Sequence, residues 1–207
     1  MELIKRALCP RCLRAARACI CDCVITVPSD IDVLILQHVA EARHIKNSAR
    51  LLHLCLPSSR LISDAQLDDA SLSAILNEQA SVLLYPASAT MHAAVFSSDD
   101  VNLRKKTRLV VIDASWRQSR QMLARYPSLQ ALPRYALPDS IIADYQPRYH
   151  IRRAHQEHQL STLEATALAL QQWDSDFQCA LLLDAFERFN AQQIAFGVLN
   201  LQRGSQD

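Results

Sequence analysis

The sequence has 207 residues, half of them hydrophobic, which is enough to bury the core of one domain with a small appendage. Its only two glycines, Gly197 and Gly204, exclude the glycine-rich phosphate loops of P-loop and dinucleotide-binding proteins. The apolar runs are too short to span a membrane and no signal-peptide core opens the chain, so we expect a cytoplasmic protein without membrane contact.

Charge is balanced overall but unevenly distributed, with 22 Lys and Arg against 21 Asp and Glu. Residues 1–17 hold five basic side chains against one acidic, and residues 104–126 hold seven against Asp113 alone. A positive face of this kind attracts nucleic-acid phosphates, whereas ordinary solvated helix faces would give the same counts. Charge alone leaves both interpretations open.

A cluster of cysteines opens the chain: Cys9 and Cys12 form a CxxC pair, and Cys19 and Cys21 form a CxC pair. An odd total of seven cysteines without a secretory signal favours a reducing compartment and metal ligation. Four thiolates are what a closed, structural zinc site requires, so the spacing predicts zinc, with reduced thiols or a redox pair as alternatives. Cys23 is a spare cysteine or a substitute fourth ligand.

Beyond the cysteines, the hydrophobic pattern alternates between strands and helices. Buried strands are predicted at 31–37, 81–85 and 109–112. Helices are predicted at 47–55, 72–79 and 117–125. This alternation predicts an α/β protein with a parallel sheet covered by helices.

The last third of the chain changes character. Four prolines make its first part irregular, with room for short strands around 140–143 and no regular helix: Pro127, Pro133, Pro138 and Pro147. Two long helices are then predicted at 162–173 and 177–196, and we expect them to close the domain. Ser161 and Glu164 have the spacing of a capping box at the start of the first.

Polar side chains follow the first predicted strand, at His38, Glu41 and Arg43. The carboxyl ends of parallel strands form the ligand-binding edge of an α/β sheet, so these residues are candidates for a site. The alternatives are a hydrogen-bonded structural role for His38 and a surface pair of Glu41 with Arg43.

The segment Asp113-Ala-Ser115-Trp116 ends the third predicted strand and begins a basic helix. Asp113 or Ser115 could be the N-cap of that helix. Helix capping does not explain Trp116. A large aromatic side chain beside a carboxylate suits stacking on adenine or another base. Core packing is the commoner use of tryptophan.

A further segment places Tyr149, Arg152 and Arg153 before the helix that begins near Ser161 and Thr162. Paired arginines before a helix N-terminus could hold a carboxylate or a phosphate, since guanidinium groups match both. Ion pairing with the acidic C-terminal helices is the alternative.

Taken in order, these segments and Leu84-Tyr85-Pro86 resemble the DTW-domain family, whose bacterial members are tRNA-uridine aminocarboxypropyltransferases. The resemblance covers almost the whole chain. It departs at Ser115 and Ser48, where the family usually has threonine, and at Val39, where it commonly has proline.

The resemblance implies a SPOUT-like, knotted parallel sheet flanked by helices. A small four-cysteine zinc module would occupy residues 1–28 and the catalytic domain residues 29–207. The implied reaction moves the 3-amino-3-carboxypropyl group of S-adenosylmethionine to N3 of a tRNA uridine, by analogy at tRNA position 47, and releases methylthioadenosine. A SAM-dependent RNA methyltransferase and a non-catalytic zinc-dependent RNA-binding module are the alternatives.

The resemblance also suggests roles for individual residues. Asp113 would be the catalytic base, because an aspartate at a strand end can accept a proton if burial raises its pKa. Residues expected to bind S-adenosylmethionine are Leu84, Tyr85, Pro86, Asp113, Ser115, Trp116, Arg152, Ser161, Thr162 and Glu164. Residues expected to bind tRNA are His38, Arg43, Arg117, Arg120, Arg125 and Arg153. No obligate protein partner is inferred.

Overall fold

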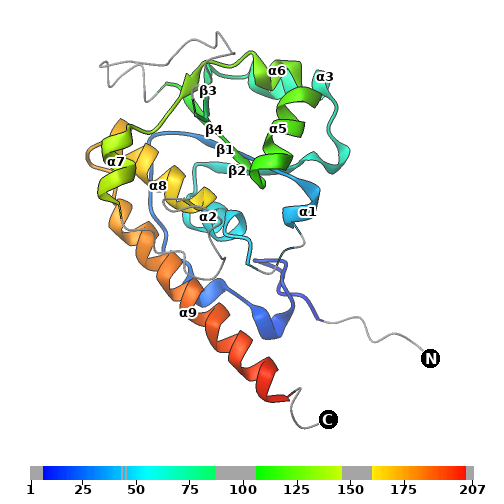
Figure 1. The fold of residues 1–207 in the computed structure, drawn as a ribbon, viewed down its shortest axis with the longest axis vertical. Helices are drawn as coiled ribbons and strands as arrows, with labels where there is room; N and C mark the ends of the chain where they lie inside the picture. The colour runs from blue at the N-terminus through cyan, green and yellow to red at the C-terminus, as the bar shows by residue number, and fades with distance from the viewer. Residues whose placement is uncertain (1–6, 43, 45, 87–105, 146–159, 204–207) are drawn as a thin grey trace, which may run out of the picture.

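The computed structural model describes residues 7–42, 44, 46–86, 106–145 and 160–203. Within these residues one sheet has five strands in the order β2-β1-β4-β3-β5, and every pairing is parallel (Figure 1). The strands are β1 (Val33–Gln37), β2 (Ser59–Ser63), β3 (Ser81–Leu84), β4 (Arg108–Asp113) and β5 (Arg134–Tyr135). The predicted α/β class and parallel sheet are confirmed.

The central strands are buried on both faces. In β1, Val33 and Ile35 enter one hydrophobic core, whereas Leu34 and Leu36 enter a second core on the opposite face. An apolar run without polar alternation is the pattern of a strand covered on both sides. The sequence of β1 therefore requires a three-layer arrangement.

Helices supply the two outer layers (Figure 1). One core joins the sheet to α2 (Ala49–Cys55), α8 (Thr162–Trp173), α9 (Cys179–Arg203) and the cysteine-rich segment. The other joins it to α3 (Asp69–Leu76), α5 (Trp116–Arg125) and α6 (Pro127–Gln130). Short elements complete the described chain: α1 (Val39–Ala42), α7 (Asp139–Asp144), and 3-10 turns at Ala16–Ala18, Cys21–Cys23 and Asp64–Gln66.

The proline-rich part contradicts the prediction. Helix α7 occupies the residues where short strands were expected, and α6 is a further helical turn that begins at Pro127. Proline suits the first turn of a helix because its missing N–H would have no partner there, and Pro138 stands directly before α7. Pro127 and Pro138 therefore stand at helix starts, whereas Pro133 precedes β5 and Pro147 lies outside the described residues.

Other differences concern boundaries and short strands. Helix α8 and its capping box lie where they were predicted, whereas α2 begins at Ala49, two residues late. Helix α3 lies three residues earlier than expected, and α9 begins later and extends to Arg203. Strand β2 was missed because it is a partly exposed edge strand, and β5 because it has two residues.

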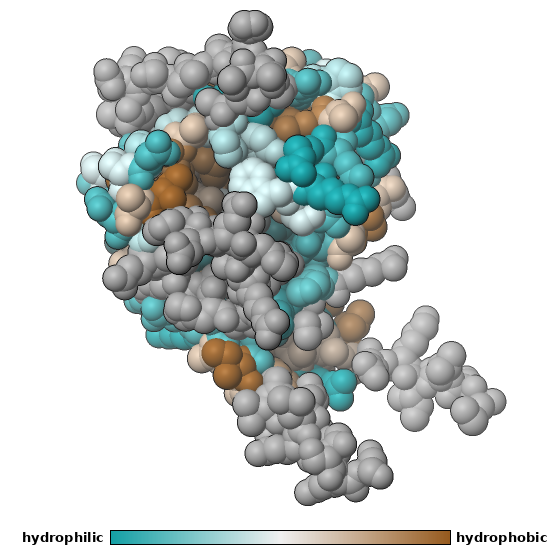
Figure 2. Space-filling view, in the orientation of Figure 1, coloured by the Kyte–Doolittle hydropathy of each residue, from teal (hydrophilic) through white to brown (hydrophobic). Residues whose placement is uncertain are grey.

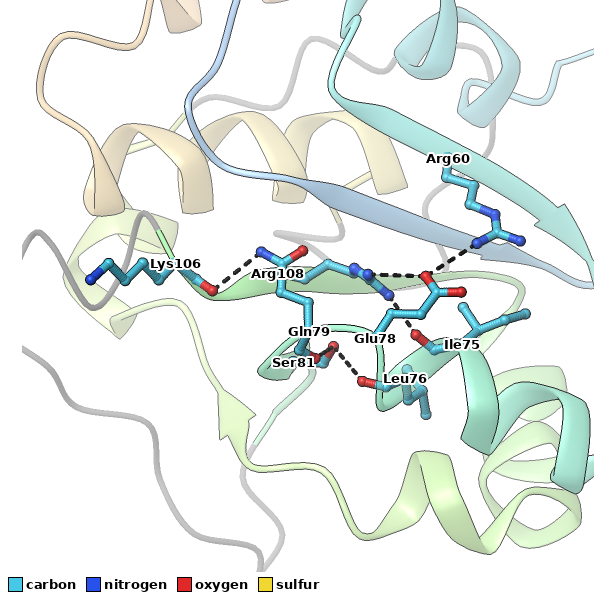
Figure 3. A network of polar contacts seen from close by, with 8 residues as sticks. All are labelled: Arg60, Ile75, Leu76, Glu78, Gln79, Ser81, Lys106 and Arg108. Carbon is cyan, nitrogen blue, oxygen red and sulfur yellow. Dashed lines mark hydrogen bonds and ion pairs between the residues drawn. The ribbon is translucent and has the colours of Figure 1, made fainter.

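The amino edge of the sheet is held by exposed polar contacts (Figure 3). Glu78, beyond the end of α3, accepts from Arg108 of β4 at 3.4 Å and from Arg60 of β2 at 3.5 Å. Arg108 also donates to the carbonyl of Ile75 at 2.8 Å. The Arg60 and Glu78 side chains are half exposed, so their pair stabilises the fold by about 1 kcal/mol or less. Arg108 is 11% exposed, but its partner Glu78 remains in contact with solvent.

The cysteine-rich segment packs into the core that joins the sheet to α2, α8 and α9. It contributes Cys12, Ile20, Cys23 and Val27 to that core. A division of the chain at residue 28 and a knotted, SPOUT-like sheet stay predictions. No helix in the described part of the chain has both the length and the apolar character needed to span a membrane.

Candidate functional site

Asp113 is the centre of a buried polar network at the carboxyl edge of the sheet. The pairing of β1 with β4 sets Gln37 directly beside Asp113. Atom Oδ2 of Asp113 accepts from Gln37 Nε2 at 2.9 Å and from Asn47 Nδ2. Atom Oδ1 accepts from the Thr162 hydroxyl at 2.9 Å. Three neutral donors, from β1, the segment before α2 and the start of α8, thus hold one carboxyl group that is 4% exposed.

Burial raises the pKa of Asp113 above its ordinary value, and the Glu41 carboxylate acts in the same direction. The hydrogen bonds from Gln37, Asn47 and Thr162 favour the charged form and oppose this effect. The outcome is a fixed carboxylate that binds a proton more readily than an aspartate in water. This is the property that a general base needs at neutral pH.

Helix α8 begins at this carboxylate. Ser161 and Glu164 form the predicted capping box, in which Ser161 accepts from the Glu164 amide at 3.2 Å and Glu164 accepts from the Ser161 amide at 2.8 Å. Glu164 also accepts from the Tyr145 hydroxyl at 3.2 Å and is fully buried. The capping box therefore fixes the start of α8, from which Thr162 reaches Asp113.

An exposed tryptophan stands near the same edge. Trp116 is the first residue of α5 and is 47% exposed, with its ring edge-to-face against Tyr85 at a centroid distance of 5.7 Å. The Tyr85 hydroxyl lies 3.0 Å from that of Ser119, and the Arg134 guanidinium lies 4.9 Å from the Tyr85 ring centre. Trp116 is thus supported from one side and open to a ligand on the other parts of its surface.

Ser115 is the N-cap of α5, so the capping interpretation holds for Ser115 and not for Asp113. Its hydroxyl accepts from the Gln118 amide at 3.4 Å and donates to Gln118 Oε1 at 2.7 Å. Leu84 is half-buried against the core on one face of the sheet, Tyr85 packs against the core on the other face, and Pro86 is exposed. The predicted adenine wall therefore lies on the strand next to Asp113 in the sheet.

His38 and Glu41 lie at the carboxyl edge of the sheet, close to Asp113. His38 is half-buried; its amide donates to the Asp113 carbonyl at 3.0 Å and its Nδ1 accepts from the Ala40 amide at 3.2 Å. Glu41 is 8% exposed and is therefore not a surface residue, whereas its alternative pairing with Arg43 stays a prediction. Arg43, Arg152 and Arg153 lie outside the described residues.

Basic side chains line the outer face of α5. Arg117 and Arg120 are exposed, and Arg125 donates to the Leu67 carbonyl at 3.3 Å and lies over the Tyr126 ring. Figure 2 shows hydrophilic side chains gathered over α5 and hydrophobic ones near α7. The basic cluster of the sequence is divided, because Arg108 lies in the ion pairs of the amino edge.

The four predicted zinc ligands come together. The sulfurs of Cys9, Cys12, Cys19 and Cys21 all lie within 4.8 Å of one another. Cys9 is 3.6 Å from Cys21, and Cys12 is 3.7 Å from Cys19. Four sulfurs at zinc-bonding distance in a tetrahedron are separated by about 3.8 Å, whereas a disulfide needs about 2.05 Å. The arrangement fits a tetrahedral metal ion.

Local structure favours a thiolate in this cluster. Hydrogen bonds from the amides of Cys12 and Arg11 lower the pKa of the Cys9 thiol to about 6, whereas burial raises that of Cys21. Leu13 has a φ of 58°, a left-handed conformation in the turn that follows the CxxC pair. Cys23 lies apart and its thiol contacts Gln192 of α9 at 3.7 Å, so within the described residues it is a packing residue.

Sequence reasoning gave no role to four residues that contact this site or its neighbours: Gln37 and Asn47, which donate to Asp113, Arg14, which donates to the Asn47 carbonyl, and Arg134, which lies over the Tyr85 ring. Gln37 carried a signal, since it is a polar residue at the end of an apolar strand. The importance of Asn47 and Arg14 depends on tertiary contacts that join segments far apart in the sequence. Arg134 is 2% exposed, a position that its proline-rich surroundings did not suggest.

Comparison with known proteins finds two relatives with related names. A protein named tRNA-uridine aminocarboxypropyltransferase 2 from Drosophila melanogaster is 29% identical over 180 residues, which cover 80% of this chain and 66% of that protein. One named tRNA-uridine aminocarboxypropyltransferase A from Arabidopsis thaliana is 26% identical over 136 residues, 58% of this chain and 51% of that protein.

The match with these relatives thus spans between half and two thirds of their lengths. No solved structure was found to match the chain. The family model described as the DTW domain matches residues 6–194, which include the cysteine cluster, the Asp113 network and most of α9. On this match, the chain belongs to the DTW-domain family.

Proposed function

We propose that the protein is a tRNA-uridine aminocarboxypropyltransferase that uses S-adenosylmethionine as donor. The names of the two relatives support the reaction class and the tRNA substrate. The observation that carries the proposal is Asp113, a buried carboxylate with a raised pKa at the carboxyl edge of a parallel sheet, close to an exposed tryptophan. That edge is where α/β proteins bind nucleotides and similar ligands.

In the proposed reaction, Asp113 accepts the proton from N3 of the uridine. The N3 lone pair forms a bond to Cγ of the methionine group, and the Cγ–S bond breaks with its electron pair moving to the sulfonium sulfur. Methylthioadenosine leaves as a neutral thioether. Because the sulfonium is already a good leaving group, deprotonation and alignment of N3 with Cγ supply most of the acceleration.

The substrates are assigned to the surfaces beside Asp113. Leu84, Tyr85 and Pro86 form the wall for adenine, and Trp116 stacks on the adenine or the target base. Ser161, Thr162 and Glu164 shape the turn that receives the methionine group, and the N-terminus of α8 favours a negative group there. Ser115 fixes the direction of α5 and hence of Trp116. Arg152 is assigned to the cofactor carboxylate.

The proposal also includes a structural zinc site and a set of residues that bind tRNA. The sulfurs of Cys9, Cys12, Cys19 and Cys21 fit a structural zinc ion, which closes the N-terminal module and takes no part in the transfer. The basic residues assigned to tRNA phosphates and to the nucleotide around the target uridine are His38, Arg43, Arg117, Arg120, Arg125 and Arg153. The target is N3 of the uridine at tRNA position 47, in the cytoplasm.

The test is product analysis. Zinc-loaded protein is incubated with S-adenosylmethionine and tRNA from a strain that lacks the gene, and nucleosides and small molecules are analysed by mass spectrometry. We expect aminocarboxypropyl-uridine and methylthioadenosine in equal amounts. Methyluridine with S-adenosylhomocysteine would move the protein to the methyltransferases. tRNA binding without either product would leave a non-catalytic RNA-binding module.

A further inference from the structure

We propose that Arg14 and Asn47 are positioning residues that couple the cysteine module to the carboxylate of Asp113. The proposal rests on the proposed function, in which Asp113 takes the proton from the uridine. It concerns two side chains that act through Asp113 and are not themselves assigned to the donor, the uridine or the metal. They join the cluster at residues 9–21 to the carboxyl edge of the sheet.

The first contact fixes Arg14 within the module. The Cys9 amide donates to the Arg14 carbonyl at 2.7 Å, so the backbone of Arg14 belongs to the loop that carries the CxxC pair. The Arg14 guanidinium lies 5.2 Å from the ring centre of Phe189 on α9 and donates to the Asn47 carbonyl at 2.8 Å. The folded cysteine loop thereby holds the backbone of Asn47.

The second contact fixes Asp113. Asn47 is 5% exposed, and its side-chain oxygen accepts from Gln37 Nε2 at 3.1 Å and from the Arg50 amide at 3.3 Å. These bonds leave the Asn47 NH2 group directed at Asp113, to which it donates. Because Gln37 donates to both Asn47 and Asp113, a shift of Asn47 disturbs two of the three donors that hold the carboxylate.

Each neighbouring element contributes a group that affects this carboxylate. Strand β1 and helix α8 supply the neutral donors Gln37 and Thr162, and α1 supplies the Glu41 carboxylate, which disfavours the charge on Asp113. The hydrogen bond from Asn47 favours the charge. Loss or displacement of Asn47 therefore raises the pKa of Asp113 further, since the opposing contribution of Glu41 remains.

The test measures Asp113 directly in the full, zinc-loaded chain without substrates. The carboxyl ¹³C resonance of Asp113, assigned by its absence in Asp113→Asn, is titrated in wild type and variants. Asn47→Ala and Arg14→Met should both raise the pKa of Asp113, whereas Arg14→Lys, which keeps a donor, should restore it towards wild type. The double variant Arg14→Met/Asn47→Ala should titrate like Asn47→Ala alone, because both changes act through one residue.

Activity provides the second readout. We expect kcat/KM to fall about ten- to hundredfold in Asn47→Ala and less in Arg14→Met, the range for a lost hydrogen bond to a charged group. Arg188→Met removes an exposed charge on α9, next in sequence to the Phe189 that Arg14 contacts, and should change neither the titration nor kcat/KM. Zinc content and thermal unfolding are measured for every variant.

The proposal is overturned if Arg14→Met titrates like wild type, if the two changes add in the double variant, or if Arg14→Met acts by losing zinc. Failure of the proposed function has a different signature. Wild type would then give no transfer product, whereas the coupled titration of Asp113 would still be observed.

Discussion

The two ends of strand β4 carry opposite charges in very different surroundings. Arg108 at the amino end shares the half-exposed Glu78 with Arg60, so its charge is paired with a carboxylate that remains in contact with solvent. Asp113 at the carboxyl end is 4% exposed and is held by neutral donors, and its pKa is raised. The ion pairs at the amino end lose little hydration and add little to the free energy of unfolding. Burial of the Asp113 carboxylate, in contrast, removes a charge from water and lowers the free energy of unfolding.

From this difference we infer that the carboxyl edge of the sheet is the functional one. Burial of a carboxylate with a raised pKa costs stability, so we infer that the three donors hold Asp113 for the proposed chemistry.

Replacement of Asp113 by asparagine should have the largest effect. The asparagine carbonyl can still accept from Gln37 and Asn47, and its NH2 group can donate to the Thr162 hydroxyl, so we expect the variant to fold. Transfer in single-turnover assays should fall by about 10²- to 10⁴-fold, the usual contribution of a general base. The matched control at the amino edge, Glu78→Gln, should keep its rate. Equal rates for Asp113→Asn and wild type would remove Asp113 from the chemistry.

Loss of one metal ligand should have the next largest effect. Cys19→Ser should bind zinc at least about tenfold more weakly and unfold at lower temperature, because a structural zinc site contributes directly to folding. Cys23→Ser, outside the cluster, should retain one zinc per chain. Metal analysis and thermal unfolding report both results. Zinc retained by Cys19→Ser but lost by Cys23→Ser would mean that the ligand set is wrong.

Substitutions of Trp116 test whether the carboxyl edge binds adenine or another base. We expect Trp116→Ala to raise the KM for tRNA or for S-adenosylmethionine about tenfold, within the range measured for base stacking on aromatic side chains. Trp116→Phe should keep most of the affinity. Because Trp116 is exposed, its fluorescence should change when the stacked substrate binds. Unchanged KM values for both substrates in the alanine variant would refute the stacking role.

The raised pKa of Asp113 has a consequence for stability. An aspartate in the unfolded chain has a pKa of about 3.9. Below that value wild type has the full stability that protonated Asp113 allows, and this contribution is lost as pH rises through the higher folded pKa. Asp113→Asn lacks the titration, so its stability relative to wild type should increase with pH over this window. Denaturant unfolding at several pH values measures the difference, and a decreasing difference would give the pKa shift the opposite sign.

The smallest effect is expected at the amino edge. Glu78→Gln removes both ion pairs shown in Figure 3 but leaves the Arg108 contact with the Ile75 carbonyl. We expect a loss of less than about 1 kcal/mol in the free energy of unfolding, which high salt should reduce further. A loss of several kcal/mol would show that the amino edge is as important to folding as the carboxyl edge.

Local sequence patterns predicted the parts of this molecule that depend on local physics. The apolar run of β1, the capping box of α8 and the four clustered cysteines were identified because each pattern has one simple structural solution. The helices at Pro127 and after Pro138 were missed because proline both ends and begins helices. The edge strand β2 was missed because a half-exposed strand carries no clear hydrophobic period.

The candidate site was predicted less completely. The strand-end rule located Asp113, and the aromatic residue after it located Trp116. Gln37, Asn47 and Arg14 were not identified, because their importance arises when β1, the segment before α2 and the cysteine loop meet at one carboxylate. Residue spacing in the sequence does not predict tertiary contacts between segments that are far apart in the chain.

The most direct test of Asp113 as the proton acceptor is the pH dependence of single-turnover transfer by the zinc-loaded protein, compared between wild type and Asp113→Asn. We predict that the wild-type rate rises with pH across the raised pKa of Asp113 and then levels off. The variant should be slow and show no rise over that range. A variant that keeps the wild-type rate and pH profile would contradict the account.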